Sequence, residues 1–584
     1  MKLSDYVVKC IADAGVKHVF MLPGGGAMHL NDSLGRCKEL QYVCCLHEQA
    51  AAIAAEGYAR ITNNLGACMV TCGPGGTNAI TGVAGAWLDS TPVIFISGQV
   101  KRADMKGDSG VRMKGVQEID IVSLVKPITK YAVTVMDSET IRYHMEMALY
   151  LARTGRRGPV WIDIPLDVQA SEIEPEKQQE LVETEWALVL GSITKDLSPK
   201  VTQAIAMLQA AKRPVILIGN GARSARIVGL TNNLCVPVLK TLLALDLFPD
   251  DHPRSVGSPG TLAPRCANLT LQNADLLLIL GTRLDMAMVG YDYKNFAPNA
   301  KKIMVDIDAN ELKKMPIDLP IHADVSVFVN ELVKRNYISY DIPWTNRVAD
   351  WKRWYPAILP KHREQQSPVS MYHFSEVLSE EMTESDVIVS GSSGTAVEIF
   401  LLCLKIKAGQ RCFHNRGTGA MGFGLPAAIG AALASGRRTI LVDGDGGFQM
   451  NIQELATLSR LRLPVKCFVV NNNGYASIRA SQKQHFGRVM ADQGNGVLPS
   501  LRMQADACGI AYYRIERAGG MREKIQAVLK ESTGPVICEV FVLPDEEREP
   551  RVVSKQVDGQ MVSGKLEDLW PYLPRDEFEA NMTN

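Results

Sequence analysis

Two strongly apolar stretches in the last third of the chain end abruptly in polar clusters. TILVDGDGG (439–447) places Asp445 directly after a predicted strand, and PVKCFVVNNNG (464–474) places Asn472 after the next one. The segment between them, MNIQELATLSRL, has apolar positions at helical spacing. The carboxyl ends of parallel strands meet at one edge of a sheet, so we expect Asp445 and Asn472 to converge on one point.

These residue types suit a metal bound to a phosphate. The Asp445 carboxylate, the Asn472 amide oxygen and the backbone carbonyl of Gly474 are hard oxygen ligands, and Mg²⁺ completes such a set with phosphate oxygens and water. The glycines of GDGG, including Gly446 and Gly447, let backbone N–H groups approach a phosphate. A simpler interpretation, that both polar clusters only cap turns, stays open on this stretch alone.

The elements that must position these residues follow one plan along the chain. Apolar strands alternate with helices and end in glycine-rich turns, which is typical of parallel sheets covered by helices on both faces. We predict an α/β protein of three doubly wound parallel-sheet domains, with a charged linker at about 171–186 and a stretch of weak pattern at about 337–368. The predicted units are 1–170, 190–335 and 365–545, followed by an extended C-terminal arm with a short helix, 546–584.

Composition argues against several other classes of protein. The chain has 584 residues, and its 63 Lys and Arg balance its 63 Asp and Glu, so no net field attracts nucleic acid or an anionic membrane. The 13 cysteines form no CxxC pair, which argues against a disulfide framework or a zinc site. The N-terminal segment predicts an amphipathic helix and not a signal peptide, and no apolar run is long enough for a membrane span. We expect a cytoplasmic protein.

Several motifs together resemble one family. GDGG followed by NN resembles the metal and diphosphate motif of thiamine-diphosphate-dependent enzymes. The acetolactate synthase branch of that superfamily is similar over about residues 3–545, through the segments CLHEQAAAIAAEGYAR (45–60), CGPGGTNAITGV (72–83) and GTGAMGFGLPAAIGAA (417–432). The resemblance implies thiamine diphosphate and Mg²⁺ as cofactors. It also orders the three domains as pyrimidine-binding, central Rossmann-like and diphosphate-binding.

The resemblance implies three catalytic residues, Glu48, Gln117 and His29. Glu48 would bond N1′ of the aminopyrimidine and favour the tautomer whose nitrogen takes the C2 proton, although a Glu in a first helical turn is otherwise most often a dipole partner. His29 is either a polar site residue or a helix-start residue, and His47 is either in the site or only structural. In the family Glu48 and Asp445 of one site come from different subunits, which implies a homodimer or homotetramer.

The resemblance also implies which residues contact the cofactor. Met421 would be the apolar wedge that bends it, although Met equally fills gaps in a core. Asp445, Asn472 and Gly474 would hold the metal. The remaining thiamine diphosphate contacts would be Pro74, Asn78, Gly394, Thr395, Gly419, Gly446, Gly447, Ser477 and Ile478.

The central unit is similar to the flavin-binding domain of acetolactate synthases. Its motifs KRPVILIGNGAR, KTLLALD, GTRLD and DIDANEL follow the order of the FAD contacts there. FAD, if bound, would be structural, because carboligation needs no net redox step; the alternative is a related domain without flavin. The implied contacts are Gly219, Gly221, Thr241, Leu242, Gly281, Arg283, Asp306, Ile307, Asp324 and Val325. Of these, Gly219, Gly221 and Arg283 would face the diphosphate, and Asp306 would hold a ribose hydroxyl.

Departures from the family pattern concern the substrate. The turn DIPLD has Leu166 where a Lys is usual, Ser477 and Ser481 stand where Met and Trp are usual, and Thr395 and Ala396 replace Gln and His. Loss of a bulky indole opens the acceptor side of the pocket. These changes fit the branch of the family that transfers a two-carbon unit from pyruvate to a nucleotide-linked keto-deoxysugar.

Alternative functions stay open on the sequence. The first is an acetolactate synthase large subunit or another 2-oxo-acid lyase, against which the missing Trp and Lys count. A non-catalytic scaffold subunit is a different class, and the presence of Glu48, Asp445 and Asn472 argues against it. A flavin redox enzyme is a third alternative, which the sequence does not favour.

Overall fold

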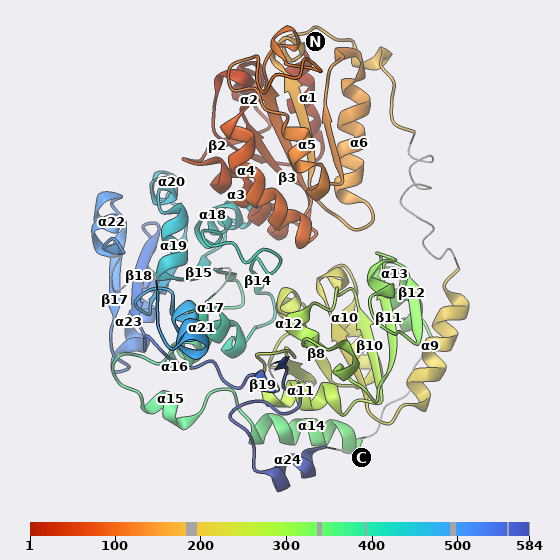
Figure 1. The fold of residues 1–584 in the computed structure, drawn as a ribbon, viewed down its shortest axis with the longest axis vertical. Coiled ribbons are helices and arrows are strands. Elements are labelled where there is room, and N and C mark those ends of the chain that lie inside the picture. The colour runs from red at the N-terminus through yellow and green to blue at the C-terminus, as the bar shows by residue number, and fades with distance from the viewer. Residues whose placement is uncertain (183–195, 336–341, 392–393, 491–497, 558–559, 583–584) are drawn as a thin grey trace.

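Three separate parallel sheets build the molecule. The structure, a computed structural model of the chain, describes residues 1–182, 196–335, 342–391, 394–490, 498–557 and 560–582. Each sheet has six strands, and every strand pair within the three sheets is parallel. Helices cover both faces of each sheet, and the three units surround a common centre (Figure 1). The predicted α/β class with three doubly wound parallel sheets is therefore confirmed.

The N-terminal unit has the strand order β2-β1-β3-β4-β6-β5. Its inner strands β3, β4 and β6 are buried along their whole length, as expected for a parallel sheet covered on both sides, whereas the edge strands β2 and β5 are partly exposed. Strands are β1 (His18–Met21), β2 (Gln41–Cys44), β3 (Gly66–Val70), β4 (Val93–Gln99), β5 (Tyr131–Thr134) and β6 (Val160–Pro165); helices are α1 (Leu3–Asp13), α2 (Met28–Arg36), α3 (Glu48–Thr62), α4 (Pro74–Leu88), α5 (Ile121–Val125), α6 (Ile141–Arg153) and α7 (Leu166–Gln169).

The central unit has the strand order β12-β11-β10-β7-β8-β9. Its middle strands β7 and β10 are buried along their whole length, because helices pack on both faces. Strands are β7 (Pro214–Ile218), β8 (Val238–Lys240), β9 (Ser255–Gly257), β10 (Leu276–Leu280), β11 (Lys301–Asp306) and β12 (Leu319–His322); helices are α9 (Ser198–Ala210), α10 (Ile227–Leu234), α11 (Arg265–Gln272), α12 (Met286–Val289) and α13 (Val325–Val333).

The C-terminal unit has the strand order β14-β13-β15-β16-β18-β17. The expected strand–helix–strand unit is present, with β15 and β16 paired side by side. Strands are β13 (Val387–Ser390), β14 (Arg411–Phe413), β15 (Thr439–Gly444), β16 (Val465–Asn471), β17 (Ala511–Ile515) and β18 (Val536–Phe541); helices are α16 (Met371–Glu381), α17 (Thr395–Cys403), α18 (Gly424–Ser435), α19 (Asp445–Phe448), α20 (Glu454–Arg460), α21 (Ala476–Phe486), α22 (Leu501–Ala507) and α23 (Met521–Lys530).

Small residues allow the N-terminal and C-terminal units to pack closely through α3 and α18. A Cβ added at Gly57 would lie 2.4 Å from the Ala427 carbonyl oxygen, and one at Gly430 would lie 2.0 Å from the Ala54 carbonyl oxygen. Larger side chains would therefore push the two helices apart. The Ala- and Gly-rich sequences of both helices are explained by this contact.

The stretch 337–368 contains helices that its weak pattern did not predict. In the described part, α14 (Ile342–Trp354) and α15 (Pro360–Glu364) follow the central unit. Trp344, Val348 and Trp351 of α14 stand at helical spacing and are buried in that unit's core.

The C-terminal arm returns to the central unit (Figure 1). It contains a hairpin, β19 (Lys555–Val557) with β20 (Gln560–Val562), and ends in α24 (Arg575–Asn581). The Asn581 side chain accepts a hydrogen bond from Trp351 Nε1 at 2.7 Å, which ties α24 to α14. Among the helices within the described ranges, none combines the length and apolar character needed to cross a bilayer.

Candidate functional site

The ends of β15 and β16 bring the predicted metal ligands together. The two strands pair in register from Thr439 to Gly444, so Asp445 and the turn after Asn471 leave the sheet at the same edge. The backbone N–H of Gly474 donates to Asp445 Oδ2 at 2.8 Å, and the N–H of Gly446 donates to Oδ1 at 2.8 Å. These two bonds fix the orientation of the Asp445 carboxylate.

The polar atoms at this edge fit a metal ion. Asn472 is buried, and its Oδ1 has no hydrogen-bond partner among the described residues. An amide oxygen of this kind costs free energy unless it binds something. Arg479 Nη2 holds the Asn472 carbonyl at 2.8 Å, so the turn that presents Oδ1 is itself anchored. Gly474 has φ 98°, a left-handed conformation that favours glycine.

The charge at this edge also suits a cation. Burial raises the pKa of Asp445, while the N–H groups of Gly474 and Gly446 oppose that shift by bonding the charged form. Within the described ranges no three His, Cys, Asp or Glu side chains are grouped so as to hold a metal. One carboxylate, one amide and one carbonyl are therefore the ligand set that this edge offers, and phosphate oxygens would complete it.

Glu48 begins a second cluster, at the starts of α3 and α4. It is the first residue of α3 and is buried, and its Oε2 accepts a hydrogen bond from Asn78 Nδ2 at 3.0 Å. His47 caps α3 by accepting the Gln49 N–H at 3.1 Å, which supports the structural alternative for this histidine. Two of the residues predicted for the pyrimidine end, Glu48 and Asn78, are thus in contact.

Gln117 lies beside the same helix starts. It has φ 64°, a rare conformation for a residue other than glycine, and a Cβ at Gly73 would lie 2.7 Å from its carbonyl oxygen. Gly73 directly precedes Pro74, the first residue of α4, so Gln117 and Pro74 are neighbours. His29 lies on α2, half-buried; within the described residues no hydrogen bond joins it to Glu48 or Gln117.

Two residues that the sequence did not single out connect this cluster with the C-terminal unit. Asn451 Nδ2 donates to Gln49 Oε1 at 3.1 Å and to the Gly422 carbonyl at 2.8 Å. Glu454 Oε1 accepts the Leu46 N–H at 2.8 Å. The signal for both was present, because they are polar residues on a predicted helix that must face another element.

The predicted cofactor contacts of the C-terminal unit lie in turns or first helical turns. Met421 follows the turn that contains Gly419 and is 41% exposed, so it does not fill a gap in the core. Gly394 caps α17 with φ 103°, and Thr395 is the buried first residue of that helix. A Cβ at Gly446 would lie 2.5 Å from the Tyr475 ring, and Gly447 is half-buried beside it.

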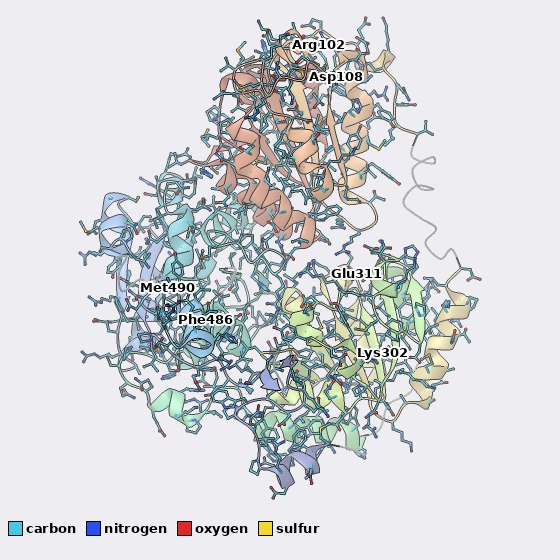
Figure 2. The ribbon with its side chains drawn as sticks, viewed as in Figure 1. Arg102, Asp108, Lys302, Glu311, Phe486 and Met490 are labelled. Carbon is cyan, nitrogen blue, oxygen red and sulfur yellow. The ribbon has the colours of Figure 1, made fainter. Side chains whose placement is uncertain are left out.

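The segment where the sequence departs from the family forms α21. Ser477 is half-buried, whereas Ile478 is 52% exposed and Ser481 is exposed. Phe486 and Met490, beyond them, also lie exposed on the surface of the C-terminal unit (Figure 2). Leu166, the other departure, begins α7 directly after β6 in the N-terminal unit.

A large cavity lies where the three units meet. Its volume is about 670 Å³, and residues of all three units line it. That volume is within the range of ligand sites, roughly 300–1,000 Å³. The wall includes nine of the ten residues predicted for flavin: Gly221, Thr241, Leu242, Gly281, Arg283, Asp306, Ile307, Asp324 and Val325.

The tenth residue, Gly219, supports the wall from behind. A Cβ there would lie 2.2 Å from the Gly281 carbonyl oxygen, so the turns after β7 and β10 pack backbone to backbone. Asp306 ends β11, and its Oδ1 accepts the Asp308 N–H at 2.9 Å. Burial raises the pKa of Asp306 to about 6. A carboxylate at a strand end of this kind suits a ribose hydroxyl.

Arg283, on the cavity wall, also makes contacts with the N-terminal unit. Its Nη2 lies 3.3 Å from Asp89 Oδ1, and its Nη1 donates to the Leu88 carbonyl. On the other side of the same boundary, Arg156 bonds Glu311 Oε1 at 2.9 Å, and Glu311 lies on the side of the central unit that faces the N-terminal unit (Figure 2). These arginines join the two units at the cavity.

The architecture and the strand-end site agree with family models along the chain. Residues 1–124 match the thiamine pyrophosphate enzyme N-terminal TPP binding domain, 201–332 its central domain and 392–540 its C-terminal TPP binding domain. Thiamine pyrophosphate is another name for thiamine diphosphate. The fold and these matches define a thiamine pyrophosphate enzyme.

Curated relatives narrow the class. The chain is 33% identical over 564 residues to the acetolactate synthase isozyme 1 large subunit of Escherichia coli, which covers 96% of this chain and 97% of that protein. It is 32% identical over 563 residues to a probable acetolactate synthase large subunit of Methanocaldococcus jannaschii, with 94% and 93% covered. The Lactococcus lactis large subunit is 31% identical over 566 residues, with 96% of each chain covered. The chain belongs to the acetolactate synthase-like family of thiamine-diphosphate-dependent enzymes.

Proposed function

We propose that this protein is a Mg²⁺-dependent carboligase that decarboxylates pyruvate and transfers the two-carbon unit to a ketone acceptor. The acceptor is larger and more polar than pyruvate, such as a nucleotide-linked keto-deoxysugar. The family membership supports the thiamine chemistry. The composition of α21 supports the choice of acceptor.

The residues of this chain would divide the work between the two clusters. Bound thiamine diphosphate supplies an acidic carbon and an electron sink for decarboxylation. Asp445, Asn472 and the Gly474 carbonyl would hold Mg²⁺ and, through it, the diphosphate. Glu48, oriented by Asn78, would hold a proton at the pyrimidine ring nitrogen. Because Glu48 is buried, a hydrogen bond from its carboxyl group lies in a low-dielectric environment, which strengthens the bond.

The observation that carries the acceptor proposal is the surface of α21. Ser481 is exposed at the position where the family usually has Trp, and Ser477 stands where the family usually has Met. Loss of an indole removes up to about 250 Å² of apolar surface from a site. A small 2-oxo acid would be poorly enclosed there, whereas a bulky ketone would have room.

We further propose that FAD occupies the cavity between the three units and that the active enzyme is a homodimer or homotetramer. The nine predicted flavin residues on the cavity wall support the first point. The second extends the resemblance to the family, in which Glu48 and Asp445 of one site come from different subunits. Subunit exchange of complementary inactive variants, Glu48→Gln with Asp445→Asn, should restore activity if one site uses both chains.

The acceptor is tested by product analysis. Purified protein is given thiamine diphosphate, Mg²⁺ and pyruvate, alone and with a panel of ketones that includes a nucleotide-linked 4-keto-deoxysugar. We expect carbon dioxide release and a branched product only with the larger acceptor. Acetolactate from pyruvate alone, at the same rate with or without the sugar, would refute the proposed acceptor.

A second function has independent support. The similarity to acetolactate synthase large subunits over nearly the whole chain favours acetolactate synthesis itself. The same assay separates the two, because that activity needs only pyruvate. Failure to consume pyruvate with any acceptor would indicate a different 2-oxo acid donor.

A further inference from the structure

Many cationic side chains line the cavity between the three units. Ten Lys and Arg residues contribute to its wall, which would be costly without anionic partners. Eight of them are bonded to acceptors of the protein through their side chains. These eight include Arg60, Arg156, Arg223, Arg283, Arg411 and Lys240.

Arg283 is one of the eight cations whose side chains already bond acceptors of the protein. Its contact with Asp89 is made inside the protein, since the Asp89 side chain is 0% exposed. The other Asp89 oxygen, Oδ2, is held by Arg60 Nη2 at 2.9 Å and by the Arg416 N–H at 3.0 Å. If Arg283 turned to a ligand, Asp89 Oδ1 would lose its cationic partner in a buried place. Breaking such a pair is strongly unfavourable.

Arg416 differs in its contacts from the eight cations that bond acceptors of the protein. It lines the cavity, and its guanidinium has no hydrogen-bond or ion-pair partner among the residues that the structure describes. Lys405 also lines the cavity and is exposed, and its ammonium group likewise has no partner among the described residues. An unpaired, half-buried guanidinium offers a planar set of donors to a ligand.

The backbone of Arg416 is fixed at this place. A Cβ at Gly417 would lie 2.4 Å from Leu88 Cβ, so the chain is pressed against the N-terminal unit there. Asn415 Oδ1 accepts the N–H groups of Thr418 and Gly419 at 3.0 and 3.1 Å, which holds the turn in one shape. Arg416 therefore extends from a rigid turn beside the carboxylate that Arg283 already occupies.

We infer that Arg416, and not Arg283, supplies the positive charge that meets the diphosphate of a dinucleotide in the cavity. The inference rests on the proposed FAD. A phosphate is the natural partner of such a side chain, because Arg binds phosphate oxygens through two parallel hydrogen bonds. Arg283 instead keeps the central unit attached to the N-terminal unit around the same ligand.

The test is a binding measurement on full-length protein freed of flavin. FAD is titrated by quenching of its fluorescence at several KCl concentrations, for wild type, Arg416→Gln, Arg416→Lys and the matched control Lys405→Gln. We expect Arg416→Gln to weaken FAD binding about 10- to 100-fold and to make the Kd less dependent on salt. Arg416→Lys should restore part of the affinity, and Lys405→Gln should change the Kd by less than about threefold.

The outcomes separate the two proposals. A wild-type Kd in Arg416→Gln, an unchanged salt dependence, or an equal loss in Lys405→Gln overturns the role of Arg416. Wild-type protein that neither contains nor binds FAD overturns the flavin proposal and this role with it. The carboligase proposal is judged separately, by its own product assay.

Discussion

Asp246 is the residue whose replacement should most clearly weaken the junction of the central and C-terminal units. Its carboxylate accepts bonds from Arg223 Nη1 and Nη2, each at 2.9 Å, and from Arg411 Nη1 at 2.7 Å. The Asp246 side chain is 2% exposed and both arginine side chains are 16% exposed, so water cannot replace these partners well. In Asp246→Asn two guanidiniums lose their counter-charge.

The expected cost follows from this burial. Removing one partner of a buried ion pair costs about 3–5 kcal/mol, which corresponds to a fall in Tm of roughly 10 °C for a unit of this size. Scanning calorimetry measures the fall. Hydrogen exchange should increase in both units, at 242–247 and at 411–413. The matched control is Asp386→Asn, because Asp386 bonds Arg438 twice at 2.7 Å within the C-terminal unit alone.

The pH dependence of stability gives a second check on Asp246 and its two arginine partners. Burial alone would raise the pKa of Asp246, but the guanidiniums of Arg411 and Arg223 outweigh it and hold the pKa well below its usual value. A lowered carboxyl pKa contributes stability above the unfolded value near 3.9, and that contribution is lost as pH falls through the folded value. The difference between wild type and Asp246→Asn should thus be constant from about pH 5 to 8. A difference below 1 °C, or faster exchange in only one unit, would refute the reasoning.

Three further predictions concern the site. Glu48→Gln, which can keep its contact with Asn78, should lower kcat about 10²- to 10⁴-fold. Thiamine diphosphate should still bind to this variant, as measured by calorimetric titration. A wild-type kcat would contradict the role of Glu48 in holding the proton. Asn472→Ala should raise the Mg²⁺ concentration for half-maximal activity at least about tenfold, whereas the exposed Asn473→Ala should not; equal effects would point to a change in the turn and not to a lost ligand. Ser481→Trp should lower kcat/KM for a bulky ketone about tenfold or more and leave the KM for pyruvate unchanged, and an unaltered kcat/KM for the ketone would remove α21 from the acceptor site.

The helices and strands that carry the site were predictable because their signals are local. The apolar runs of β15 and β16 and the polar clusters after them can be identified within short windows. Their parallel pairing then follows from general rules for strand–helix–strand units. The helix α14 was missed, although its buried Trp344, Val348 and Trp351 stand at helical spacing.

The partners of individual side chains were less predictable. The family resemblance placed Arg283 at a diphosphate, and the structure adds contacts with Leu88 and Asp89 of another unit that the sequence did not indicate. Arg416, which lies in a glycine-rich turn, was given no role from the sequence. Both outcomes depend on how the units are placed against each other, and no local pattern encodes that placement.

The sequence by itself determined the fold class, the family and the set of polar residues at the strand ends, because periodicity, glycine turns and motif spacing are properties of neighbouring residues. The tertiary structure decided which of those groups meet. It joined Asp445 to the Gly474 turn, left Asn472 Oδ1 without a partner and enclosed a cavity between three units. Such contacts join residues far apart in the chain, so their energies depend on packing that only the folded molecule sets.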